Sequence, residues 1–253
     1  MAENESPYRA LFPSAAAQKR RKAAVKAVVK MRKNAAVLNE ADRLTQIFNV
    51  AARLFCERGF EGTTMSDIAE AIGVTKAAVY HFMPGNKQDL LFAVMSYGMD
   101  TLDQAVIEPA RTIADAELRL RAIITNHVKL VASGSTSEGY NPVTVVVDEV
   151  GGLSPQQRRK LDERKRAYVE LIRQTLTALE KEGKLRDINV TVIAFALIGA
   201  IMWLARWYRP EGKLTPDEVA ADLSQIVLGG ILRPRKIAAK PVATTAAKRA
   251  KRR

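Results

Sequence analysis

Apolar residues recur at intervals of three and four positions along most of the chain, a periodicity that predicts α-helices. Two helix starts are marked by a hydroxyl residue followed by proline, because the hydroxyl accepts from an orphaned amide and proline lacks one. The predicted helices lie at 41–59, from Thr64, from Thr75, at 87–107 (ended before Pro109), 115–133, 155–182, 190–208 and 216–231. This pattern predicts an all-α fold.

Two segments allow a second interpretation. Val143–Val147 is mostly β-branched, which favours a strand, but no partner strand is predicted elsewhere, so we expect a helix. Val190–Ala205 is apolar apart from Thr191, yet it is shorter than the ~20 residues that usually span a bilayer. We expect it to be buried in a bundle or at a subunit interface, and a membrane-associated sensor is the weaker hypothesis.

The segment from Met65 to Phe82 has the pattern of a helix-turn-helix. Ala69 is small and Gly73 follows four residues later, which lets two short helices approach and turns the chain between them. Thr75 is placed to cap the second helix, which enters the DNA major groove N-terminus first in such motifs. The apolar residues that would fill the wedge are Ile68, Ile72, Val74, Val79 and Phe82.

The run from Ile47 to Phe82 resembles the N-terminal domain of TetR-type transcriptional regulators. It contains in order the elements AARLF, GF, TTM, DIA, GV and Y-H-F. The resemblance implies a three-helix DNA-binding domain at 40–90 and a larger helical ligand-binding and dimerisation domain at 91–232. It also implies a homodimer that binds a palindromic double-stranded operator as a repressor and is released by a ligand.

The same resemblance, position by position, suggests which residues contact DNA. Thr64 is expected to donate to a phosphate, and Lys87 to hold one at the positive end of the next helix. The family commonly has two residues between the motif's last aromatic residue and this lysine, whereas Met83–Asn86 makes four here. For His81 a packed or solvent-facing ring is the alternative. The residues expected to face the groove or the backbone are Thr75, Lys76, Ala77, Tyr80 and His81.

The later half resembles TetR-type regulators of lipid and steroid catabolism, several of which respond to acyl-CoA thioesters. The elements are Asp148-Glu149, Leu153-Ser154-Pro155, Arg164, Tyr168, Gly183, Leu185-Arg186 and the run from Trp207 to Ala220. The resemblance implies a large apolar effector, preferably a fatty or steroid acyl-CoA, with a hydrophobic drug or metabolite of an efflux regulator as the alternative. The candidate ligand contacts are His127, Glu149, Phe195, Met202, Trp203, Arg206 and Trp207. For His127 and Glu149 a satisfied buried polar pair is the alternative, and for the others a role in the dimer interface or in capping helix ends.

The net charge of +13 is concentrated at the ends of the chain. Residues 1–39 carry +7 and residues 233–253 carry +9, which leaves the middle slightly acidic at −3. Neither end can build a core, so we expect two basic, disordered tails. Because residues 40–90 hold five basic side chains against seven acidic ones, we expect the N-terminal tail to add affinity for DNA. The C-terminal tail remains either a solubilising extension or a second DNA arm.

Several other classes of protein are disfavoured by composition. The single cysteine, Cys56, cannot form an internal disulfide, and no apolar leader is visible, so a cytoplasmic protein is expected. With two histidines and no phosphate loop, Cys-x-x-Cys or Gly-x-Ser-x-Gly motif, we expect no enzyme, metal or cofactor. A hypothesis of a different class is a non-specific DNA binder driven by the tails, with affinity falling steeply as salt rises.

Overall fold

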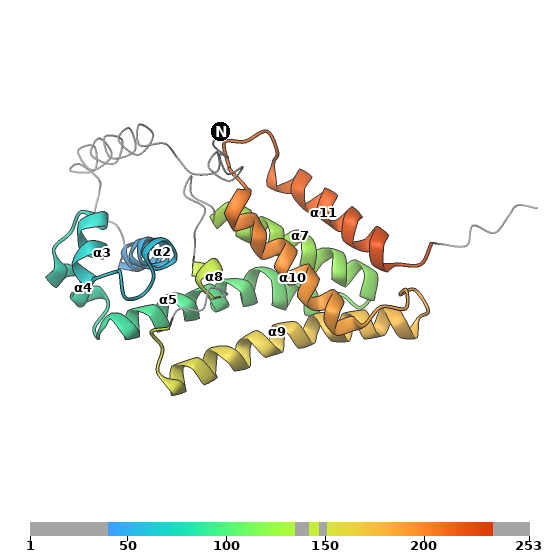
Figure 1. Ribbon diagram of the computed structural model, residues 1–253, viewed down its shortest axis with the longest axis horizontal. Coiled ribbons are helices and arrows are strands. Elements are labelled where there is room, and N and C mark those ends of the chain that lie inside the picture. Colours follow the sequence, from blue (N-terminus) through green and yellow to red (C-terminus); the bar gives the residue numbers. More distant parts are fainter. Residues whose placement is uncertain (1–39, 135–141, 147–150, 235–253) are drawn as a thin grey trace, which may run out of the picture.

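The computed structural model describes residues 40–134, 142–146 and 151–234 (Figure 1). Over these residues the fold is all-α, as predicted, and an isolated bridge between Leu185 and Leu232 is the one β-type pairing. The helices are α2 (Glu40–Arg58), α3 (Met65–Ile72), α4 (Lys76–Phe82), α5 (Lys87–Leu102), the π-helical η3 (Asp103–Ile107), α6 (Glu108–Arg111), α7 (Ala116–Gly134), α8 (Pro142–Val145), α9 (Pro155–Lys181), α10 (Val190–Trp207) and α11 (Pro216–Ile231).

One predicted boundary is wrong. The helix that begins at Lys87 was expected to end before Pro109, but helical backbone continues to Arg111. After Leu102 the hydrogen-bonding pattern changes to a π-helical turn, and Pro109 then falls in the first turn of α6. An amide in that position needs no intrahelical acceptor, so proline is tolerated there. In the Val143–Val147 segment, which has strand propensity, Val143 to Val145 belong to the short helix α8, as expected.

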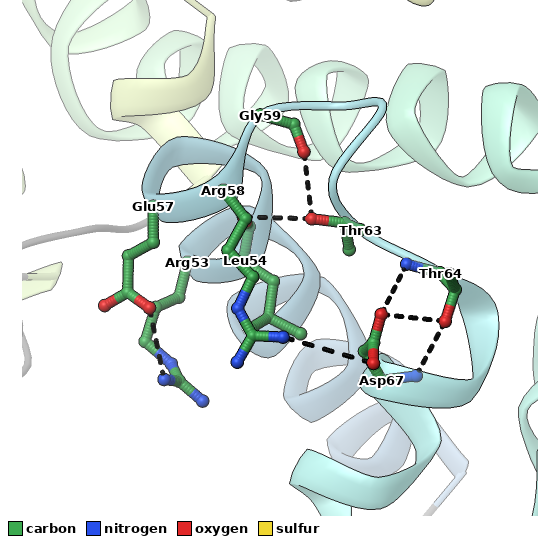
Figure 2. Close-up of polar contacts among 8 residues, drawn as sticks. All are labelled: Arg53, Leu54, Glu57, Arg58, Gly59, Thr63, Thr64 and Asp67. Carbon is green, nitrogen blue, oxygen red and sulfur yellow. Dashed lines mark hydrogen bonds and ion pairs between the residues drawn. The ribbon is translucent and has the colours of Figure 1, made fainter.

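The helix-turn-helix is fixed by local hydrogen bonds (Figure 2). The buried hydroxyl of Thr63 donates to the carbonyls of Leu54 (3.1 Å) and Gly59 (2.9 Å), which ties the loop to the end of α2. Thr64 and Asp67 form a capping box at the start of α3, and hydrogen bonds from Thr64 lower the pKa of the Asp67 carboxyl. The loop therefore sets the angle between α2 and α3 without distant contacts.

Helix α5 belongs to both parts of the molecule. It packs against α2 of the helix-turn-helix unit, and further along against α8 and α9 (Figure 1). The other long helices form a bundle in which α7 contacts α9, α10 and α11. The guanidinium of Arg164 on α9 donates to the carbonyl of Ser96 (3.2 Å) and pairs with Asp100 (2.7 Å) and Asp103. This holds α9 against α5 where the π-helical turn begins.

Two capping boxes meet at the junction between the two parts. Asn86 and Asp89 close the first turn of α5, and Ser154 and Gln157 close the first turn of α9. The side-chain amide of Gln157 also donates to Asp89 Oδ1 (3.2 Å). The first turns of α5 and α9 are thus capped by one connected set of hydrogen bonds.

The segment just before α9 presses on the helix-turn-helix unit. Gln88 Nε2 donates to the carbonyl of Gly152 (2.7 Å), and a Cβ atom on Gly152 would lie 2.5 Å from the Phe60 ring. Lys87 covers the same ring, with Nζ 4.1 Å from its centroid, and donates to the Phe60 carbonyl (2.7 Å). A residue without a side chain is therefore required at Gly152.

One polar pair lies within the bundle core. The His127 ring on α7 and the Tyr168 hydroxyl on α9 are hydrogen-bonded, with 2.9 Å between Tyr168 Oη and His127 Nδ1. His127 is 1% exposed and Tyr168 4%. Because burial penalises the charged forms, the pKa of His127 is lowered to about 4 and that of Tyr168 is raised. Both side chains are neutral at pH 7.

Replacing Gly152 with alanine is expected to destabilise the protein, because the new methyl group collides with Phe60. The expected loss in unfolding free energy is about 1–3 kcal/mol, measured by urea denaturation. Gly151→Ala is the matched control, since nothing lies within 4 Å of its added methyl group and the unfolded chain changes in the same way. Equal effects of the two substitutions would show that the close contact at Phe60 has no energetic role.

Stability is expected to fall as the pH drops from about 6.5 towards 4, because unfolded His127 binds a proton that the folded ring excludes. Above pH 6.5 this stabilisation is complete, and below it one histidine contributes a slope of about 1.4 kcal/mol per pH unit. The control is His127→Phe with Tyr168→Phe, which removes the titrating ring and its hydrogen-bond partner together. Denaturation from pH 4.5 to 7.5 should give a shallower slope for this variant, and identical slopes would exclude the histidine as the cause.

Candidate functional site

The first candidate site is the outer face of α4. Thr75, Lys76, Ala77, Tyr80 and His81 are all exposed on the helix or its cap, as the DNA-contact prediction requires. Beneath them Val79 is completely buried, and the hydroxyl of Thr75 accepts from Ala78 N (3.2 Å). The Lys76 ammonium lies 5.9 Å from the centroid of the Tyr80 ring. The helix therefore presents a small polar and aromatic surface on a buried support.

Two residues predicted to bind phosphate have partners within the protein. The Thr64 hydroxyl is exposed, accepts from Asp67 N (3.1 Å) and donates to Asp67 Oδ2 (2.8 Å). Lys87 is 24% exposed, donates to the Phe60 carbonyl and lies 3.9 Å from Glu61 Oε2. Sequence analysis missed this internal role of Lys87, although the longer Met83–Asn86 turn that precedes it was the available signal.

The second candidate site is a cavity of about 220 Å³ inside the bundle. Three of the predicted ligand contacts, His127, Phe195 and Met202, come together on its wall. The remaining lining comes from α5, α8, α9 and α10 and from Val146 just after α8, and is mainly apolar: Gly98, Met99, Leu102, Val143, Val146, Lys165, Tyr168, Val169 and Ile198. Of these, Tyr168 was noticed in the sequence only as part of a resemblance, because pairing between α7 and α9 leaves no local pattern.

The other predicted ligand contacts lie elsewhere. Trp203 (64% exposed), Trp207 (47% exposed) and Arg206 are on the outer surface of α10 and are not part of the cavity lining, so their prediction as ligand contacts is not matched in the single chain. Helical periodicity explains the difference, since these side chains point away from the face that carries Ile201 and Leu204. Glu149 lies outside the described residues.

The cavity leads towards a charged groove on the outside of α9. Lys165, Val169 and Phe195 line both the cavity and this groove of about 820 Å³. The groove also carries Arg166 and Arg173, together with the acidic groups Asp162, Glu163 and Glu170. The apolar chamber thus adjoins a surface groove that carries both basic and acidic side chains.

Helix α8 connects the cavity with the helix-turn-helix unit. Val143 lines the cavity, while the same short helix packs against both α5 and α2. The contact with α5 is very close, because a Cβ atom on Gly98 would lie 2.3 Å from the Pro142 carbonyl oxygen. The short helix α8 therefore joins the cavity wall to α2 of the helix-turn-helix unit.

The outer faces of α10 and α11 carry apolar side chains with no cover in the single chain. The exposed ones are Val192, Phe195, Trp203 and Trp207 on α10 and Ile226 on α11. By length and composition α10 is also apolar enough to cross a membrane. Its inner face, however, packs against α7 and α9, which leaves only the outer stripe in need of a cover.

Metal chemistry has no support in the part of the chain that the structure describes. Across residues 40–134, 142–146 and 151–234, no group of three or more His, Cys, Asp and Glu side chains is arranged to hold a metal ion. The two candidate sites are an exposed helix face and an apolar chamber with one polar pair.

Comparison with known proteins agrees with this division. Residues 47–94 match the family described as "Bacterial regulatory proteins, tetR family", and residues 114–231 match "Tetracyclin repressor-like, C-terminal domain". The HTH-type transcriptional repressor KstR2 of Rhodococcus jostii (strain RHA1) is 32% identical over 198 residues, which cover 77% of this chain and 94% of the relative.

Solved structures show the same similarity. A crystal structure of AibR in complex with isovaleryl coenzyme A and operator DNA is 36% identical, with a TM-score of 0.63, covering 73% of this chain and 97% of that one. The ketosteroid transcriptional regulator KstR2 of Mycobacterium tuberculosis has a TM-score of 0.67 over 79% and 98% of the two chains, and its 24% identity indicates the fold alone. The chain belongs to the TetR family of transcriptional regulators.

Proposed function

We propose that this regulator is a homodimeric repressor that binds a palindromic operator through α4 and is released by an acyl-CoA thioester. The observation that carries the proposal is the connection between its two sites. Helices α5 and α8 line the cavity and also pack against α2 of the helix-turn-helix unit. A ligand that moves either helix changes the position of α4, so binding in the cavity and binding to DNA are linked.

The DNA contacts come from Thr75, Lys76, Ala77, Tyr80 and His81, which are exposed together on α4. In a dimer, two such helices enter major grooves separated by one turn of DNA, about 34–36 Å. Thr64 reaches a phosphate from the start of α3 once its hydroxyl rotates away from Asp67. Lys87 supports the interface from behind by holding the Phe60 carbonyl. The basic tails add affinity that is independent of DNA sequence.

The dimer forms through the outer faces of α10 and α11. Their exposed large apolar side chains form the kind of surface that is typical of protein–protein interfaces. In this assembly Trp203 and Trp207 contact the second subunit rather than a ligand. The exposed apolar residues of α10 are then buried by the second subunit rather than by a membrane. The regulator accordingly acts in the cytoplasm, where its operator DNA is.

The effector places its acyl group in the cavity and its CoA portion along the groove on α9. The cavity volume of about 220 Å³ corresponds to roughly seven water molecules at about 30 Å³ each, so it fits a short or medium acyl chain better than a steroid nucleus. Phosphates of CoA would meet Arg166 in the groove, and also Lys165 and Arg173 once these exchange their ion pairs with Asp162 (3.9 Å) and Glu170 (3.2 Å) for the ligand. The relative AibR has been crystallised with isovaleryl coenzyme A, and KstR2 relatives are named repressors.

A hydrophobic drug or metabolite is the second candidate effector. It is favoured by the apolar lining of the cavity, which needs no CoA portion to be filled. The two effector classes differ in the groove, because an uncharged drug makes no use of its cationic side chains.

Selection from a random DNA pool is expected to return one palindrome for the full chain and for a 40–232 fragment. Lys76→Ala should weaken binding to that palindrome about tenfold, equivalent to ~1.4 kcal/mol, because it removes a cation from the groove-facing side of α4. Fluorescence anisotropy at fixed salt measures the change. Lys160→Ala, which removes an exposed lysine from α9, is the matched control and should leave affinity unchanged.

If the fragment selects no sequence and the full chain binds every sequence alike, the tail-driven DNA binder replaces the repressor. A steep salt dependence of all binding would accompany that result.

Trp203→Asp is expected to convert the dimer into a monomer, because it places a charge at the centre of the exposed apolar stripe on α10. Sedimentation velocity over a concentration series should show the dimer dissociation constant rising by at least about a hundredfold, or ~2.7 kcal/mol. Leu118→Asp on α7 is the matched control, since Leu118 is also exposed (59%) but belongs to neither helix of the proposed interface. A dimer that survives Trp203→Asp would place the interface on another surface.

A further inference from the structure

A histidine that lines the ligand cavity has a buried ring nitrogen without a hydrogen-bond partner. Nε2 of His127 is solvent-inaccessible and has no hydrogen bond, and His127 is one of the residues that line the cavity. The other ring nitrogen, Nδ1, is bonded to the hydroxyl of Tyr168 at 2.9 Å. Leaving a buried polar atom unpaired is costly, and such atoms in native proteins commonly mark a missing partner.

The hydrogen bond with Tyr168 decides what Nε2 can do. Burial keeps Tyr168 protonated, so its hydroxyl has a proton to donate, and Nδ1 of His127 is the acceptor within reach. Burial also keeps the imidazole neutral, with a pKa of about 4, so it carries a single proton. If Nδ1 accepts, that proton is on Nε2. In the opposite tautomer Nδ1–H would donate to the Tyr168 oxygen, and the buried hydroxyl proton would then lack the acceptor that Nδ1 provides, which makes it the less stable arrangement.

We propose that the Nε2–H group of His127, held in this tautomer by Tyr168, donates a hydrogen bond to the carbonyl oxygen of the bound acyl group. Tyr168 is then a positioning residue, and His127 is the residue that distinguishes a thioester from a hydrocarbon chain. The inference rests on the proposed function, because it assigns a role to a residue in the same cavity.

The surroundings favour a neutral carbonyl over a charged acceptor. The walls next to His127 include Met99, Val143 and Met202, and none of these can stabilise a carboxylate. Lys165 also lines the cavity, but it is 38% exposed and lies 3.9 Å from Asp162, so its charge is already partly compensated. A carbonyl oxygen accepts one hydrogen bond from a neutral donor without bringing charge into the chamber.

The test compares two probes that differ at one position. Hexanoyl-CoA has a thioester carbonyl, whereas S-hexyl-CoA has a methylene group there, and the CoA contacts are common to both. We expect the full-length protein to bind hexanoyl-CoA about tenfold to a hundredfold more tightly in titration calorimetry, because the thioether leaves Nε2–H unpaired. In His127→Phe with Tyr168→Phe the two affinities should become equal. Met202→Ala, a change in the apolar wall, should weaken both probes and keep their ratio.

A second measurement needs no ligand. Two-bond ¹H–¹⁵N correlations of histidine side chains report which ring nitrogen carries the proton, and they should show the Nε2–H form for His127 in the wild type. In Tyr168→Phe this preference should be reduced. A protonated Nδ1 in the wild type would overturn the proposal whatever the binding data show.

The outcomes separate this inference from the proposed function. If the wild type binds both probes equally, His127 does not recognise the carbonyl, although the acyl-CoA effector stands. If neither probe binds, the acyl-CoA effector fails. In that case, observation of the Nε2–H tautomer would still support His127 as a hydrogen-bond donor to a carbonyl group of another ligand. Observation of the Nδ1–H tautomer would exclude that role.

Discussion

The structure depends on a shared set of caps at the point where the helix-turn-helix unit meets the bundle. A helix start leaves its first amides without acceptors, and α5 and α9 both begin here. The Asn86–Asp89 and Ser154–Gln157 boxes satisfy these amides, and the bond from Gln157 to Asp89 makes them interdependent. Because α5 runs on from this point into the cavity wall, the caps fix the DNA-binding helices and the ligand chamber relative to one another.

A ligand-responsive regulator needs two arrangements of such a junction. In this structure two contacts at the junction are too closely packed to be compressed. Gly98 allows α8 to approach α5 so closely that even a methyl group would collide with the Pro142 carbonyl, and Gly152 meets Phe60 in the same way. Packed contacts of this kind change by discrete shifts rather than by gradual compression. In the proposed mechanism, an acyl group that enlarges the chamber displaces a helix of its wall, such as α8. Displacement of α8 is felt at α2, which it also contacts.

The sequence predicted those features that are encoded locally. Hydroxyl residues such as Ser154 and Thr215 mark their helix starts because a cap is made within four residues, and both capping boxes are present in the structure. The π-helical turn after Leu102 and the internal bonds of Lys87 escaped prediction, since they depend on Arg164 and Phe60, which are distant in sequence. The same limit applies to the cavity. His127 and Met202 are predicted ligand contacts, but the packing of the helices decides that they line one cavity together with Tyr168 and Lys165.

Helix α10 shows how one apolar run can serve two partners. As a sequence it is apolar on every side, which suits either a membrane or a buried helix. In the fold its inner face is covered by α7 and α9, and its outer face alternates large side chains, such as Phe195 and Trp203, with the small exposed residues Ala196, Gly199 and Ala200. Two helices pack closely when large residues of one fit against small residues of the other, so this alternation suits contact with a second helix. Phe195 lies on that outer face and in the cavity wall at once, so in the proposed dimer the same ring would contact both the acyl group and the neighbouring subunit.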